Sequence, residues 1–126
     1  MTIAFWCVFV AGILPYLATV TAKAKLRDYD NNEPRARIDE LLQGYRARAY
    51  AAQLNGFEAF PFFAAAVIIA HLVHGPQHLV DILALIFIAA RIVYLLFYLG
   101  AKGTFRSLVW AVGFFSVIAI FIVAAL

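Results

Sequence analysis

Three polar side chains that could bind a ligand follow one another along a largely apolar stretch of the sequence. They are the guanidinium of Arg48, the amide of Asn55 and the carboxylate of Glu58. At about 3.6 residues per helical turn, the three lie on one face of a helix. Between them, Ala52 and Gly56 are two small residues that let another helix approach closely. Such a polar face serves either a hydrogen-bond network between helices or the binding of a ligand.

A second helical face carries Arg91, Tyr94 and Tyr98, which are three and four residues apart. Counting about 1.5 Å per residue from the intervening turn, Glu58 and Arg91 lie at similar depths. We therefore expect Glu58 and Arg91 to form an ion pair between their helices, because an unpaired charge in an apolar interior is costly. The pair is either purely structural or also orients a ligand.

A third candidate is Arg106-Ser107, at the end of a Gly-Thr-Phe-Arg-Ser sequence that is typical of the first turn of a helix. A cation there opposes the helix dipole, so it does not help the helix to form. It serves either as a charge that orients the chain in a membrane or, with Ser107 and the free amides of the turn, as an anion site. A thiol bound there would readily lose its proton, because nearby positive charge and the amino end of a helix favour the thiolate.

The remaining residues that could do chemistry suggest no further site. Cys7 is the only cysteine, and we interpret it as a small buried hydrophobe. His71, His74 and His78 surround a Gly-Pro turn that breaks any common helix face, so we expect solvated histidines and no metal site. A single cysteine excludes a disulfide framework and the usual zinc and iron–sulfur ligand sets. Any thiol chemistry must therefore use sulfur from another molecule.

The composition indicates which elements position these residues. Of the 126 residues, 66% are hydrophobic and 13% are charged, and the mean hydropathy is +0.91. A soluble domain of this size still exposes about a third of the surface of its unfolded chain, so this composition excludes a soluble globule. We predict an all-α integral membrane protein, a left-handed antiparallel four-helix bundle, because each apolar segment has about the 20 residues needed to cross a bilayer. The predicted spans are residues 2–22, 46–73, 79–100 and 105–125, with a polar loop at 23–45.

The distribution of cations predicts the topology. Seven of the ten Lys and Arg residues lie within residues 23–48, in the first loop and the first turn of the span after it; Lys102 and Arg106 flank the third connection, and the second connection has none. By the positive-inside rule, loops one and three are cytoplasmic and both termini lie on the opposite side. The net charge of +3 therefore reflects topology and not nucleic-acid binding. Pro34 is expected to begin a helix within the first loop, and Trp110 is either an interfacial anchor or a packing residue.

Two blocks of the sequence resemble the signatures of the MAPEG family, the membrane-associated proteins in eicosanoid and glutathione metabolism. Residues 55–62, Asn-Gly-Phe-Glu-Ala-Phe-Pro-Phe, resemble its N-x-x-E-x-x-P signature. Ala-Arg at 90–91, Tyr-Leu-Gly at 98–100 and Arg-Ser at 106–107 are similar to its second signature. The length, the four spans and the long first loop also agree. The resemblance thus covers essentially the whole chain, residues 1–126, as a single transmembrane domain.

The resemblance implies a homotrimer that binds glutathione as a co-substrate between neighbouring subunits, near the cytoplasmic face. It implies that Asn55 and Glu58 hold the peptide part of glutathione. It further implies that the site is lined by Arg91, Tyr94 and Tyr98 and that the sulfur faces Arg106 and Ser107.

The sequence departs from the catalytic members of the family at two positions. Those members usually carry Arg immediately before the Asn and four residues before it, where this chain has Leu54 and Ala51. Each charge-assisted contact is worth about 1.5–3 kcal/mol, so these losses would weaken glutathione binding by an order of magnitude or more. We interpret Arg48 and Arg46 as the residues that could compensate.

Two functions are compatible with these features. The first is a membrane-bound glutathione-dependent transferase or peroxidase that acts on a lipophilic electrophile or hydroperoxide, with the thiolate stabilised by Arg106. The second is a non-catalytic membrane scaffold or accessory subunit of the same fold, with weak or no glutathione binding. Arg106-Ser107 favours the first, and the missing arginines favour the second. The compact chain without an endoplasmic-reticulum signal predicts a bacterial inner membrane, with membrane lipids and no nucleic acid as partners.

Overall fold

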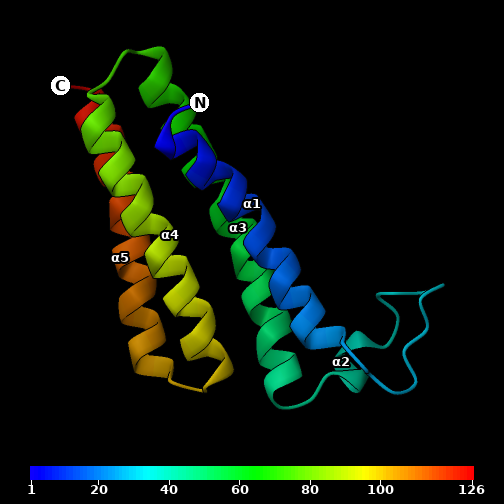
Figure 1. Ribbon diagram of the computed structural model, residues 1–126. Helices are drawn as coiled ribbons and strands as arrows, with labels where there is room; N and C mark the ends of the chain where they lie inside the picture. The colour runs from blue at the N-terminus through cyan, green and yellow to red at the C-terminus, as the bar shows by residue number, and fades with distance from the viewer.

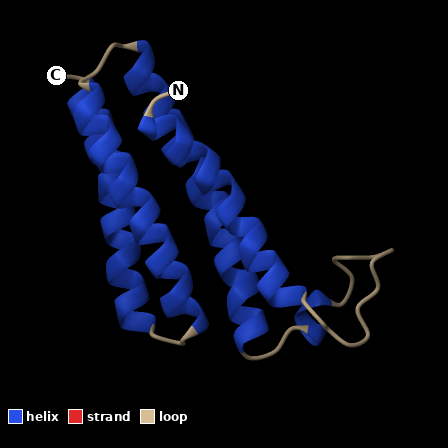
Figure 2. Ribbon diagram, in the orientation of Figure 1, coloured by secondary structure: helices blue, strands red, loops and turns tan.

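The computed structural model describes residues 1–126, which form five helices and no strand (Figures 1 and 2). The long helices are α1 (Ile3–Lys23), α3 (Tyr45–Leu72), α4 (Gln77–Leu99) and α5 (Gly103–Ala124), and α2 (Ile38–Leu41) is a single short turn. Each of the four long helices is long and apolar enough to cross a membrane. The prediction of an all-α chain with four candidate membrane spans is therefore confirmed.

The four long helices form two antiparallel pairs. In Figure 1, α1 packs along α3 and α4 packs along α5, while α3 and α4 also contact each other. The stacked rings of Phe63 and Phe87, with centroids 4.0 Å apart, join α3 to α4. Both chain termini and the 73–76 turn lie at one end of the bundle, which we call the terminal end. The 24–44 loop and the 100–102 turn lie at the other end, the loop end.

Small residues allow α1 and α3 to approach each other closely. The buried positions of α1 follow one another three or four residues apart: Ala4, Cys7, Ala11, Pro15, Ala18 and Ala22. This spacing repeats every seven residues and is typical of left-handed helix packing. In lipid there is no hydrophobic driving force between helices, so close packing of small residues must supply much of the attraction. The interpretation of Cys7 as a small buried hydrophobe is confirmed.

A carboxylate of α4 caps the first turn of α1 at the terminal end. Oδ1 of Asp81 accepts hydrogen bonds from the backbone N–H of Ala4 and from Nε2 of Gln77, both at 2.8 Å. The first N–H groups of a helix lack partners within the helix, and a negative charge there is favoured by the helix dipole. Asp81 therefore ties the start of α1 to the start of α4.

We expect Asp81→Ala to lower the free energy of unfolding by about 1 kcal/mol, because the amide of Ala4 loses its acceptor. Reversible unfolding of the purified protein in detergent measures this change. His78→Ala is the matched control, since His78 is exposed on the same helix and forms no hydrogen bond there. Equal stability of the two variants would contradict the capping interaction.

The first loop contains less helix than its sequence predicts. Residues 31–37 form turns, so the expectation of a helix that begins at Pro34 is wrong. Helix α2 begins at Ile38, which is buried with Leu42 against Ala22 and Ala49 of α1 and α3. Short helices are unstable without such packing, and the charged residues before Ile38 have none.

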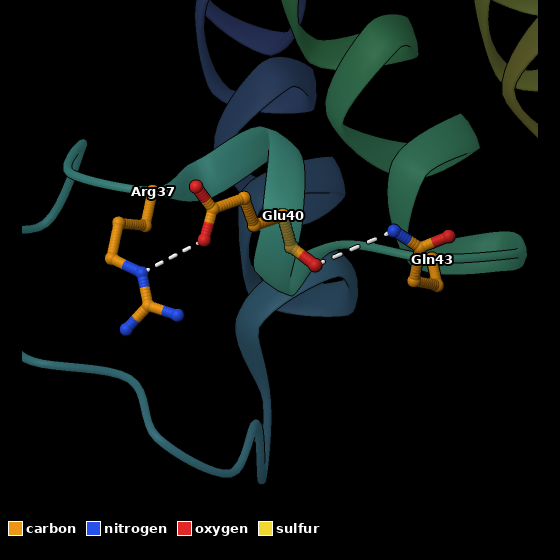
Figure 3. A network of polar contacts seen from close by, with 3 residues as sticks. All are labelled: Arg37, Glu40 and Gln43. Atoms are coloured by element: carbon orange, nitrogen blue, oxygen red, sulfur yellow. Dashed lines mark hydrogen bonds and ion pairs between the residues drawn. The ribbon is translucent and has the colours of Figure 1, made fainter.

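Polar contacts around α2 are exposed (Figure 3). Nε of Arg37 lies 2.9 Å from Oε2 of Glu40, and Nε2 of Gln43 donates to the backbone carbonyl of Glu40 at 3.4 Å. An exposed ion pair of this kind contributes little to stability. The burial of Ile38 and Leu42 therefore fixes this turn more than its charges do.

Candidate functional site

Helix α3 begins directly after a glycine with a positive φ, and two arginines lie in its first turn. Gly44 has φ of +60°, which residues with a side chain rarely adopt, and the helix begins directly after it. Nη1 of Arg46 donates to the carbonyls of Ala22 and Ala24 at 3.0 and 2.7 Å, at the end of α1. Nε and Nη2 of Arg48 donate to the carbonyl of Leu99, at the end of α4, at 3.3 and 3.1 Å. Both cations thus bind the carboxyl ends of neighbouring helices, where the helix dipole favours positive charge.

A cavity of about 200 Å³ lies between α3, α4 and α5, and we call it the larger cavity. Three of the predicted site residues form its polar lining: Asn55 and Glu58 from α3 and Arg91 from α4. The structure therefore brings Asn55 and Glu58 of the first predicted polar face together with Arg91 of the second. The rest of the lining is apolar and includes Phe62, Phe87, Trp110 and Phe114.

Two polar groups of this cavity have no partner within the chain. Oδ1 of Asn55 is buried and accepts no hydrogen bond. Arg91 is only 9% exposed, and its guanidinium forms neither a hydrogen bond nor an ion pair. Buried polar groups without partners are costly, and native structures usually satisfy them with protein, water or ligand. The larger cavity therefore fits a ligand that offers both a hydrogen-bond donor and an anionic group.

The predicted ion pair between Glu58 and Arg91 is wrong in this structure, in which Arg37–Glu40 is the only ion pair. Glu58 is exposed on α3, at the edge of the bundle. The guanidinium of Arg91 instead lies over the ring of Tyr94, 4.3 Å from its centroid. An aromatic face attracts a cation in an apolar interior, which offsets part of the cost of burial. Glu58 and Arg91 therefore line the same cavity, but their charged groups are not in contact.

Glu58→Gln is expected to leave the free energy of unfolding unchanged to within about 0.5 kcal/mol, because no ion pair is lost at an exposed position. Denaturation of the purified variant in detergent tests this. A loss similar to that of Asp81→Ala would show that Glu58 pairs with a cation after all.

Aromatic rings connect the larger cavity to the start of α5. Tyr94, which carries Arg91 on its face, meets Tyr98 edge to face with centroids 5.6 Å apart. The guanidinium of Arg106 lies 4.4 Å from the centroid of Tyr98. The two rings thus lie between the two cations, in the order Arg91, Tyr94, Tyr98 and Arg106, and we call this series the arginine–tyrosine ladder. Four of the predicted site residues belong to it.

The first turn of α5 offers an anion site beside the end of the ladder. The backbone N–H groups of Gly103, Thr104 and Phe105 have no partner, and no side chain caps the helix. Ser107 is exposed, and its hydroxyl donates to the carbonyl of Gly103 at 3.1 Å, which leaves its oxygen free to accept. Arg106 is half-buried against Tyr98. Neither Arg106 nor Ser107 lines the larger cavity, so the predicted residues form two groups joined by the ladder.

The aromatic wall of the larger cavity was not predicted. Trp110, expected as an anchor or a packing residue, stacks on Phe114 with centroids 5.2 Å apart and lines the cavity. Phe114 in turn approaches Phe62 of α3 at 6.1 Å. The four-residue spacing of Trp110 and Phe114 places them on one face of a helix, but sequence alone does not show which face meets α3.

These features define an integral membrane four-helix protein with a largely apolar cavity between its helices that three polar side chains line. A sequence model of the MAPEG family matches residues 3–126, and the chain belongs to this family. No curated protein and no solved structure matches the chain. The family includes glutathione transferases and peroxidases as well as non-catalytic members. Membership therefore agrees with both functions considered above, and the choice depends on the site.

Proposed function

We propose that this protein is a glutathione-dependent transferase or peroxidase of the membrane that acts on a lipophilic electrophile or hydroperoxide. The observation that carries the proposal is the arginine–tyrosine ladder, because it links the larger cavity, with its three polar side chains, to a cation beside free helix amides. Asn55, Glu58 and Arg91 would bind the charged and amide groups of the glutathione backbone. Arg106 and Ser107 would face the sulfur.

The start of α5 suits a thiolate. A positive guanidinium and unpaired amide N–H groups at the amino end of a helix stabilise negative charge on sulfur. In a transferase, the thiolate forms an S–C bond with an electrophilic carbon, and the electron pair leaves with the displaced group or stays on a ring-opened oxygen. In a peroxidase, two glutathione molecules reduce one hydroperoxide to an alcohol and water and leave as their disulfide.

The site supports an oligomer as the functional unit, and the resemblance to the family implies that this oligomer is a homotrimer. The larger cavity, at about 200 Å³, is below the range of about 300–1,000 Å³ that is usual for ligand pockets. Glu58, one of its polar residues, is exposed at the edge of the single chain. A tripeptide bound here would extend beyond one subunit, so a neighbouring subunit would have to complete its site.

The distribution of charge supports the proposed topology, and we propose a bacterial inner membrane as its location. Nine of the ten Lys and Arg residues lie at the loop end or in the helix turns beside it, and the tenth is Arg91. By the positive-inside rule the loop end would face the cytoplasm and the terminal end the periplasm. The anion site at α5 would then open toward the compartment in which glutathione is made.

The alternative is a non-catalytic scaffold or accessory subunit, and one observation favours it. Arg46 and Arg48, which could replace the arginines missing at positions 51 and 54, each donate to backbone carbonyls. Because a guanidinium has five N–H donors, each could still bind a carboxylate. However, their positions are already explained by helix capping.

Glutathione binding to the purified protein in detergent separates the two functions. We expect a saturable increase in thiolate absorbance at millimolar or lower glutathione. S-methylglutathione, which has no ionisable thiol, is the matched control ligand and should compete without producing the signal. If isothermal titration detects no saturable binding at millimolar glutathione, the scaffold is the better interpretation.

A further inference from the structure

Arg91 also lines a second cavity, which lies between α1, α3 and α4 and has a volume of about 20 Å³. We call it the small cavity. Its lining includes Ala11, Pro15, Gly56 and Tyr94. A space of about 10–15 Å³ is enough for one water molecule, provided that the water finds two or more polar partners. The small cavity is therefore large enough for a single water.

A carbonyl of α1 provides one such partner. α1 continues through Pro15, which has no N–H, so the carbonyl of Ala11 lacks its donor four residues along the helix. Ala11 is buried and lines the small cavity. The nearby hydroxyl of Thr19 donates to the carbonyl of Pro15 at 3.0 Å and not to the carbonyl of Ala11. A buried carbonyl without a donor is costly unless water or a side chain satisfies it.

α4 provides further partners. The guanidinium of Arg91 has five N–H donors, and none of them is used within the chain. The hydroxyl of Tyr94, which lines the same cavity, forms no hydrogen bond either. No direct hydrogen bond joins Arg91 to Ala11, although both residues line this cavity. Residues that carry unpaired donors and an unpaired acceptor thus line a space of about the size of one water.

We propose that one water molecule occupies the small cavity, accepts a hydrogen bond from the guanidinium of Arg91 and donates one to the carbonyl of Ala11. Tyr94 supplies a third partner. The water compensates for the amide hydrogen that Pro15 lacks and for part of the cost of burying a cation in the membrane interior. It also makes Ala11 and Pro15 positioning residues for Arg91, because they fix the guanidinium where the two cavities adjoin. This site does not depend on glutathione binding.

Selective isotope labelling gives an NMR signal from the carbonyl of Ala11 alone. Ala11–Gly12 is the only place in the sequence where alanine precedes glycine, so ¹³C-carbonyl alanine with ¹⁵N glycine gives one correlated signal. We expect solid-state NMR of the full chain in lipid bilayers to show transfer of magnetisation from water protons to this carbonyl. Pro15→Ala should abolish that transfer, because the new N–H takes the carbonyl. Absence of the transfer in the unaltered protein would overturn the proposal.

Two further variants distinguish the loss of the bridging water from effects that any substitution of a helix proline would have. Pro61→Ala is the matched control, because Pro61 lies within α3 and the carbonyl that it frees, that of Phe57, does not line the small cavity. It should leave the water transfer to Ala11 intact. Arg91→Lys replaces the planar donor group and should shift the Ala11 carbonyl resonance. An unshifted resonance in Arg91→Lys would show that the water does not bridge to Arg91 and would overturn the proposal.

Discussion

Arg106→Ala is expected to abolish the glutathione thiolate signal and to reduce turnover by about 10²–10³-fold, which is the usual loss when a group that stabilises developing negative charge is removed. The guanidinium lies over Tyr98 in the first turn of α5, beside the free amides of Gly103, Thr104 and Phe105. Without it, those amides remain but the full positive charge is lost. Stopped-flow absorbance with glutathione and steady-state turnover of a lipophilic electrophile measure the two effects.

The loss of thiolate signal and of turnover in Arg106→Ala should arise from the missing charge and not from unfolding of the protein. Arg106 opposes the dipole of its own helix, and its stacking on Tyr98 is worth about 0.5–1 kcal/mol at a partly exposed site. The stability of Arg106→Ala should therefore be nearly unchanged. Arg106→Lys is the matched control, because it keeps the charge but loses the planar group, and we expect an intermediate thiolate signal. Full thiolate formation in Arg106→Ala would remove this residue from the sulfur chemistry.

The sequence predicts the four long apolar helices well because their signal is local. About 20 consecutive apolar residues are required by the bilayer itself, whatever the neighbouring helices do. The polar faces of α3 and α4 were predicted for a similar reason, since charged and amide side chains inside a span must turn away from lipid. The meeting of Asn55, Glu58 and Arg91 at one cavity follows from this constraint.

Contacts between side chains were less predictable. Matching depths suggested a Glu58–Arg91 pair, but depth does not fix rotation about a helix axis, and the ring of Tyr94 competes for the same guanidinium. Likewise, Arg48 could be placed on the polar face, but its hydrogen bond to Leu99 depends on where α4 ends. These features depend on the rotation and length of neighbouring helices, which one sequence does not reveal.

Gly56 of α3 lies close to Pro15 of α1, and we expect the second large effect from a substitution at this glycine. A Cβ atom added at Gly56 would lie 2.8 Å from Cγ and 3.3 Å from Cβ of Pro15. Real Cβ atoms do not come this close to another carbon, and the ring of a proline within a helix cannot rotate away. Gly56→Ala is therefore expected to push α1 and α3 apart and to lower the free energy of unfolding by about 1–3 kcal/mol.

Two comparisons test whether Gly56→Ala lowers the free energy of unfolding because of a clash with Pro15. Gly113→Ala is the matched control within a span, because its added Cβ would meet Ala90 at an ordinary 3.6 Å and alanine favours the helix. It should be neutral or stabilising. Pro15→Ala removes Cγ, the atom at 2.8 Å, and keeps Cβ at 3.3 Å, so the double variant should be more stable than the sum of the two separate effects predicts. Coupling between contacting residues is about 0.5–3 kcal/mol, whereas strict additivity would show that Gly56 is needed for another reason.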